Sequence, residues 1–193
     1  NTSSALALSA IAEASDIPVI GVIEPGARAA AKATSSGRVG IIATEATIAS
    51  RAYEQALRRN GGRLAVSTAA CPLFVPLVEE GWWDHPVALE VARRYMGPLR
   101  RRNLDALILG CTHYPLLKRT LRKVMGPGVK LIDSAEETAL ETEQLLDAVG
   151  LRRHGGRGSR RYFVSDAPGR FLNLARRLSG MPVAKVTLHS FDS

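Results

Sequence analysis

Two residues of one short segment, Cys111 and His113, are of types that could carry out acid–base chemistry. They follow an apolar run, Leu104 to Leu109, that is typical of a short buried parallel strand. The pattern of 114–124 predicts a helix with proline in its first turn, where a missing N–H does no harm. The turn between them would place the thiol beside the free N–H groups of a helix, a setting that lowers a thiol pKa and favours the reactive thiolate. The alternative is a buried structural cysteine with a hydrogen-bonded histidine nearby.

The remaining sequence alternates between strand-like and helix-like segments. The expected strands are 19–23, 39–43, 64–67, 104–109, 129–132, 162–164 and 183–188. The expected helices are 3–15, 27–34, 48–60, a short one within 74–80, 87–101, 114–124, 134–148 and 168–178. Ser134 is expected to cap the helix that follows it, with Glu137 in capping-box spacing. This alternation predicts an α/β fold of parallel sheets covered by helices, with ligands at the carboxyl ends of the strands.

The composition is that of an ordinary globular protein. The 193 residues are 46% hydrophobic and 23% charged, and no apolar run reaches the roughly 18 residues that would cross a bilayer. Two cysteines forty positions apart, without a Cys-x-x-Cys motif, argue against a zinc site or a disulfide framework. We therefore expect a protein of the reducing cytoplasm without a membrane-spanning segment.

Much of the net charge of +8 comes from one arginine-rich segment, 152–177. Its only acidic residue is Asp166. No aromatic residue is interleaved in 151–161, so that part offers no platform for stacking on bases. We predict a solvated surface loop there and no specific nucleic-acid partner; nonspecific polyanion binding is the alternative.

Five segments resemble, in order, the motifs of the glutamate racemases, cofactor-independent enzymes that interconvert L- and D-glutamate. The most specific is Gly-Cys-Thr-His-Tyr-Pro-Leu-Leu at 110–117, which resembles their second active-site motif. The longest is Ala-Cys-Pro-Leu-Phe-Val-Pro-Leu-Val-Glu-Glu-Gly at 70–81. The other three are 1–3, 17–27 and 131–135, while 162–178 matches more loosely.

The resemblance implies a fold of two similar three-layer α/β domains with parallel sheets, the second domain inserted in the first. Here the second domain would be 25–132, and 1–24 with 133–193 would form an incomplete first domain. In the family a cysteine directly precedes the Asn-Thr that stands at Asn1 and Thr2, and an Asp-Ser-Gly motif lies far upstream. Neither is present in this sequence, so we expect a fragment that lacks one catalytic cysteine and its partner aspartate.

Inverting an α-carbon requires removing a proton from one face and delivering another to the opposite face, which two opposed thiols can do. By resemblance, Cys111 is the base that takes the proton from L-glutamate, His113 assists it, and the missing cysteine acts from the D face. Glu79 corresponds to an acidic active-site residue of the family. Its alternative is an ordinary surface carboxylate, because lone carboxylates are usually exposed.

Small polar side chains would hold the substrate. Asn1, Thr2 and Thr112 match family positions that bind the carboxylates and ammonium of the amino acid. Thr44 and Thr47 follow an expected strand, where hydroxyls could also reach an anion; the alternative for Thr47 is a helix N-cap. The other cysteine, Cys71, matches a family cysteine without a base role and is interpreted as structural.

The resemblance therefore implies a racemase that uses neither a cofactor nor a metal and supplies D-glutamate for peptidoglycan. Homodimers are common among such enzymes. Relatives that act on aspartate or hydantoins commonly carry Glu where His113 stands, so the motif favours glutamate. A second alternative is a binding or regulatory protein that keeps the fold without turnover. We expect this polypeptide alone to be inactive and its full-length parent to be active.

Overall fold

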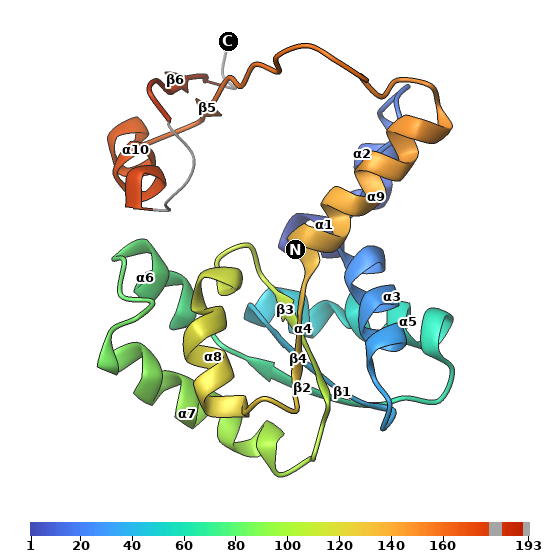
Figure 1. Cartoon of the computed structure of the whole chain (residues 1–193), viewed down its shortest axis with the longest axis vertical. Coiled ribbons are helices and arrows are strands. Elements are labelled where there is room, and N and C mark those ends of the chain that lie inside the picture. The colour runs from blue at the N-terminus through green and yellow to red at the C-terminus, as the bar shows by residue number, and fades with distance from the viewer. Residues whose placement is uncertain (178–182, 191–193) are drawn as a thin grey trace. The chain divides into compact units, whose positions relative to one another are not determined.

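The structure, a computed structural model, describes residues 1–177 and 183–190 (Figure 1). It divides into two compact units, Asn1–Arg152 and Arg153–Ser193. The larger unit contains a sheet of four parallel strands in the order β2-β1-β3-β4. The strands are β1 (Arg38–Ala43), β2 (Ala65–Ala70), β3 (Ala106–Gly110) and β4 (Lys130–Asp133). The predicted α/β fold with a parallel sheet is confirmed.

The two central strands are apolar along their whole length because both faces of the sheet are covered. All five residues of β3 are buried, as are all residues of β1 after Arg38. Alternate side chains enter two separate cores: Ile42 contributes to one, and Ile41 to the other. This pattern is what parallel strands between two helical layers require.

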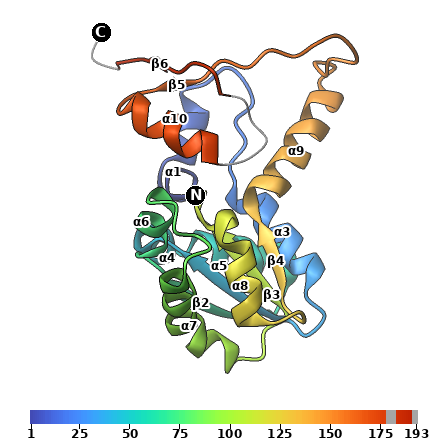
Figure 2. The same ribbon diagram turned by 60° about the vertical axis from the view of Figure 1, so that its left-hand side comes forward.

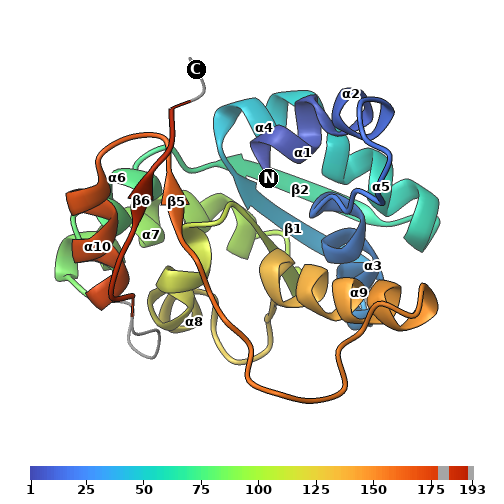
Figure 3. The ribbon, with the colours of Figure 1, turned by 90° about the horizontal axis from the view of Figure 1, so that it is seen from above.

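Helices cover both faces of the sheet. One face carries α6 (Phe74–Glu79), α7 (Pro86–Arg100) and α8 (Lys118–Met125), and the other carries α3 (Ile23–Ala33) and α5 (Ala52–Gly61). Figure 2 shows α7 beside α8, and Figure 3 shows α9 (Ser134–Ala148) beside α3. The shorter helices are α1 (Thr2–Leu6), α2 (Leu8–Glu13), α4 (Glu45–Ser50) and the 3-10 turn η1 (Tyr114–Leu117). None of the described helices is long and apolar enough to cross a membrane.

The smaller unit contains a short parallel pair, β5 (Phe163–Val164) and β6 (Thr187–Leu188), and the helix α10 (Pro168–Arg177). The rings of Tyr162 and Phe171 lie 6.4 Å apart. Both strands are shorter than predicted, and the predicted helix end at Leu178 lies outside the described residues. The arginine-rich stretch 152–161 is irregular and exposed, as a solvated loop should be.

Several predicted elements differ from the structure for identifiable reasons. No strand forms at 19–23, because Ile23 already begins α3 and Pro25 lies in its first turn, where a missing N–H is harmless. The predicted helix 48–60 is two helices, separated by Arg51 in the left-handed conformation with φ of 55°. The cap of α9 is Asp133, whose carboxylate accepts from the N–H of Ala135, and not the predicted Ser134.

The predicted helix 3–15 is also divided, into α1 and α2, at Ala7. In contrast, α7 continues through Pro98 without a break.

Candidate active site

The candidate site lies at the carboxyl edge of the sheet, where the two central strands end. From β1 the chain crosses to β2 on one side, while β3 pairs with β1 on its other side. The turns after β1 and β3 therefore diverge, and such a divergence is where open α/β sheets bind ligands. Thr44 follows β1 and Cys111 follows β3, so the fold brings these predicted site residues to the same edge.

Cys111 lies directly after β3 and is 6% exposed. Its sulfur is 3.8 Å from Nδ1 of His113. Burial raises the pKa of the Cys111 thiol, although hydrogen bonds from the backbone N–H groups of His113 and Tyr114 oppose that rise. The position in the turn predicted a lowered pKa, but the loss of water around the sulfur outweighs the donors. At neutral pH Cys111 is therefore a thiol that needs a base beside it.

Glu79 lies at the end of α6 and faces the same histidine. Its Oε1 atom is 3.5 Å from Nε2 of His113, and the two side chains are 35% and 28% exposed. An interaction at Nε2 fixes the orientation of an imidazole ring and leaves Nδ1 turned toward the sulfur. The structure thus brings the three predicted catalytic side chains, Cys111, His113 and Glu79, into one chain of contacts.

A buried contact joins the two loops that carry these side chains. The hydroxyl of Tyr114 donates to the backbone carbonyl of Cys71 at 2.8 Å. The rings of Tyr114 and Phe74 meet edge to face, with centroids 5.3 Å apart. Because Phe74 begins α6 and Tyr114 follows His113, this contact fixes the distance between the helix of Glu79 and the loop of Cys111.

Three threonines, Thr2, Thr44 and Thr47, form a cluster of hydroxyl groups. The Oγ1 atom of Thr2 lies 3.1 Å from that of Thr44 and 3.2 Å from that of Thr47, and the last two are 3.0 Å apart. Thr44 is the N-cap of α4, because its side chain accepts from the N–H of Thr47. The alternative that Thr47 is the cap is therefore wrong. Thr47 is instead buried at 2% exposure, with its hydroxyl in the cluster.

Asn1 is held by two residues that the sequence did not indicate as parts of the site. Tyr53 donates its hydroxyl to Oδ1 of Asn1 at 2.5 Å, and Nδ2 of Asn1 donates to the hydroxyl of Ser134 at 3.3 Å. Ser134 donates in turn to the carbonyl of Leu109 at the end of β3. Ser134 belongs to the motif at 131–135, which was a usable signal, whereas nothing in the sequence around Tyr53 pointed to this role.

The remaining predicted residues have distinct positions. Thr112 is exposed, and its hydroxyl lies 3.5 Å from Nδ1 of His113, on the same nitrogen that faces Cys111. Cys71 is fully buried, its sulfur contacts the carbonyl of Ala69 at 3.7 Å, and burial raises the pKa of its thiol. This environment suits the predicted structural role. Within the described ranges, no three His, Cys, Asp or Glu side chains gather closely enough to hold a metal ion.

Gly110 is the last residue of β3 and immediately precedes the thiol of Cys111. A Cβ atom at this position would lie 3.0 Å from the carbonyl oxygen of Ile42 and 3.0 Å from Cε2 of Tyr53. Glycine therefore lets β3 approach β1 and the ring of Tyr53 closely. This close approach sets where the Cys111 turn begins.

Comparison with known proteins shows which family the chain resembles in sequence and fold. A family model described as Asp/Glu/Hydantoin racemase matches residues 1–142. The glutamate racemase of Geobacter metallireducens is 53% identical over 194 residues, covering 100% of this chain and 72% of that protein. The crystal structure of a glutamate racemase from Bacillus anthracis superposes with a TM-score of 0.91 at 39% identity, covering 99% of this chain and 71% of that one.

A third relative was solved with a ligand. The crystal structure of glutamate racemase from Francisella tularensis in complex with D-glutamate has a TM-score of 0.89 at 33% identity, covering 99% of this chain and 71% of that chain. The match in family, sequence and fold extends over the segments that carry the site described above. The chain belongs to the glutamate racemases of the Asp/Glu/hydantoin racemase family.

Proposed function

We propose that the protein interconverts L- and D-glutamate through proton transfer at the α-carbon, with Cys111 as the base on one face. The observation that carries this proposal is the chain of contacts from Glu79 through His113 to the sulfur at the end of β3. Glu79 holds the imidazole, Nδ1 accepts the thiol proton, and the resulting thiolate removes the α-proton of L-glutamate. The raised pKa of the thiol makes this assistance necessary.

The second thiol of this mechanism comes from outside residues 1–193. The sequence contains two cysteines, and the other one, Cys71, is buried with a raised pKa. The chain spans 72% of the length of the Geobacter relative, which leaves room for such a residue. In this proposal 25–132 form the second of two α/β domains, and 1–24 with 133–193 belong to the first.

Substrate binding is assigned to the polar groups around the thiol. The hydroxyls of Thr2, Thr44 and Thr47, with Thr112 and the carboxamide of Asn1, supply neutral donors for carboxylates and acceptors for an ammonium group. The D-glutamate complex of the Francisella relative supports this substrate class. The product would serve peptidoglycan synthesis in the cytoplasm.

The test follows the α-proton itself. The full-length protein is incubated with L-glutamate in D₂O, inversion is followed by circular dichroism, and α-proton exchange by NMR. We expect inversion with deuterium incorporation by the unmodified protein and loss of both with Cys111→Ser. His113→Asn should lower kcat by about 10²- to 10⁴-fold, the usual contribution of a general base.

The matched control is Cys71→Ala, which removes the other thiol and should leave turnover in place. Inversion by Cys111→Ser at the unmodified rate would remove this residue from the chemistry. A folded full-length protein that binds D-glutamate without inverting or exchanging it would favour a binding or regulatory role. Residues 1–193 alone should not invert glutamate, and turnover by them would overturn the need for a second thiol.

A further inference from the structure

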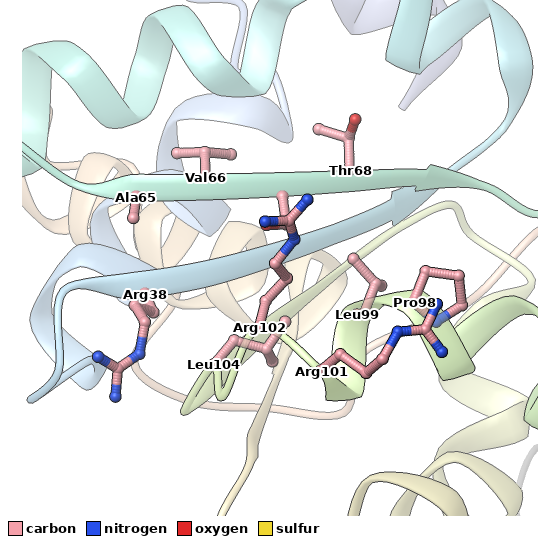
Figure 4. A pocket seen from close by; sticks show the side chains of 10 residues that line it. Arg38, Ala65, Val66, Thr68, Pro98, Leu99, Arg101, Arg102 and Leu104 are labelled. Carbon is pink, nitrogen blue, oxygen red and sulfur yellow. The ribbon is translucent and has the colours of Figure 1, made fainter.

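A groove of about 700 Å³ begins at the amino ends of β1 and β2, whereas the candidate active site lies at the carboxyl ends of the strands. It is bordered by β2 and by the segment that follows α7 (Figure 4). Three arginines line it, Arg38, Arg101 and Arg102, and none of the described residues that line it is acidic. The groove is therefore a concentrated positive site that the proposed racemase chemistry does not use.

The charges in the groove are not neutralised by nearby carboxylates. Among the described residues, neither Arg101 nor Arg102 pairs with a carboxylate, and Nε of Arg38 donates to the carbonyl of Asn103. The nearest acid along the chain, Asp105, is occupied elsewhere: it accepts from Thr34, Ser35 and Ser36. These donors hold the pKa of Asp105 well below its usual range despite the opposing effect of desolvation. The guanidinium groups therefore remain available to an incoming anion.

The backbone of β2 adds a second, independent feature. Among the described strands, β2 lies at the edge of the sheet and pairs with β1 alone. The N–H of Ala65 donates to the carbonyl of Gly37, and the N–H of Cys71 donates to that of Ala43. Because N–H groups alternate in direction along a strand, those of Val66 and Thr68 face outward. Both residues line the groove, so unpaired ladder groups and arginines border the same space.

We propose that this groove binds an acidic, extended peptide segment of a partner protein, which adds to the open edge of β2. Backbone groups of Val66 and Thr68 would pair with the peptide, and the arginines would bind its carboxylates. Figure 4 shows Arg102 extending toward the strands, whereas Arg38 extends away from them. The apolar side chains of Leu99 and Leu104 form the floor between the charges. A small phosphate would use the arginines but not the strand edge, so the two features together favour a peptide.

The test uses the full-length protein and a fluorescein-labelled heptapeptide that alternates Glu with Val. Binding is measured by fluorescence anisotropy and should weaken with added salt, because the pairing is partly electrostatic. Replacing every Glu by Gln should abolish detectable binding. An N-methylated peptide of the same charge, which cannot pair with β2, should bind about tenfold more weakly or worse.

Two pairs of variants locate the site on the protein. Arg101→Gln with Arg102→Gln should weaken binding about tenfold or more. The matched control is Arg93→Gln with Arg94→Gln, which removes the same charge from exposed positions of α7 and should leave binding in place. Thr68→Pro removes one outward N–H and should weaken binding, whereas Thr68→Val keeps that N–H and should not.

Several results would overturn the proposal. The proposal fails if the Glu-Val peptide does not bind, or if the N-methylated peptide binds as tightly as the unmodified one. It also fails if both pairs of arginine substitutions weaken binding equally. Full competition by millimolar phosphate would indicate a small-anion site instead. Self-association that Arg101→Gln with Arg102→Gln abolishes would assign the edge to a second copy of the chain instead.

Discussion

Replacing Tyr114 by Phe tests whether the contact between the two site loops stabilises the folded protein. The change removes one hydroxyl, which is fully buried and donates to the carbonyl of Cys71 at 2.8 Å. A buried acceptor left without any partner costs about 1–3 kcal/mol. This carbonyl keeps one, since the N–H of Phe74 also donates to it at 3.1 Å. We therefore expect the substitution to lower the free energy of unfolding by about 1 kcal/mol, the low end of that range. In a unit of this size such a loss lowers Tm by about 2–4 °C.

The ring of Tyr95 provides a matched control. It meets Phe74 edge to face with the same 5.3 Å centroid distance as Tyr114, and its hydroxyl accepts from the exposed N–H of Leu73 at 3.3 Å. Tyr95→Phe should cost less than about 0.5 kcal/mol, because water replaces the lost partner. Urea unfolding of both variants gives the comparison. Equal losses would refute the argument, and a loss above about 3 kcal/mol for Tyr114→Phe would mean that the N–H of Phe74 does not compensate.

Three further predictions concern the same region. Gly110→Ala should destabilise the protein by about 1–3 kcal/mol in urea unfolding, because the new methyl group would press on the Ile42 carbonyl 3.0 Å away; an unchanged midpoint would contradict this. Iodoacetamide should modify Cys111 before Cys71 in the folded protein, because Cys111 is the more exposed of the two. Burial raises the pKa of Cys111, so its modification rate should still be rising above about pH 8.5, where an ordinary thiol ionises; mass spectrometry of the peptides decides the order. Burial raises the pKa of Cys71 and of Tyr53, so the free energy of unfolding is unaffected by their ionisation at neutral pH. It should fall once these side chains ionise in the unfolded chain, above about pH 8.5 for Cys71 and above about pH 10 for Tyr53. A urea midpoint that stays constant from about pH 7.5 to about pH 10 would show that these groups do not control alkaline stability.

The parts of the fold that the sequence predicted are those with a strong local pattern. The run that ends at Leu109 is apolar on both faces, as a strand covered by helices on both sides must be. The segment 19–23 has a similar run of apolar residues but no strand forms, because a strand also needs a neighbour to receive its hydrogen bonds. A local pattern does not contain that information.

In the candidate site, too, local patterns predicted some features, whereas contacts between distant residues were not predicted. The sequence placed Cys111 and His113 at the end of a strand from spacing alone, and the resemblance to a family directed attention to Glu79. The hydrogen bond from Tyr53 to Asn1 joins two residues that are 52 positions apart in the sequence. No local sequence pattern predicts such a contact. The direction of the Cys111 pKa was wrong because a turn reveals the donors near a sulfur but not how much water the surrounding helices exclude.

The order of the strands has a consequence for synthesis on the ribosome. During synthesis β2 follows β1 and can pair with one edge of it at once. The other edge of β1 pairs with β3, with Val39 opposite Ala106, and β3 is made later. At about 5–20 residues per second, that edge stays open for several seconds while the intervening helices are made. During this interval an apolar strand with unpaired backbone groups is exposed to neighbouring nascent chains. Slower translation between β2 and β3 should therefore increase aggregation of the newly made protein, and chaperones that cover apolar strands should act before residue 110 emerges.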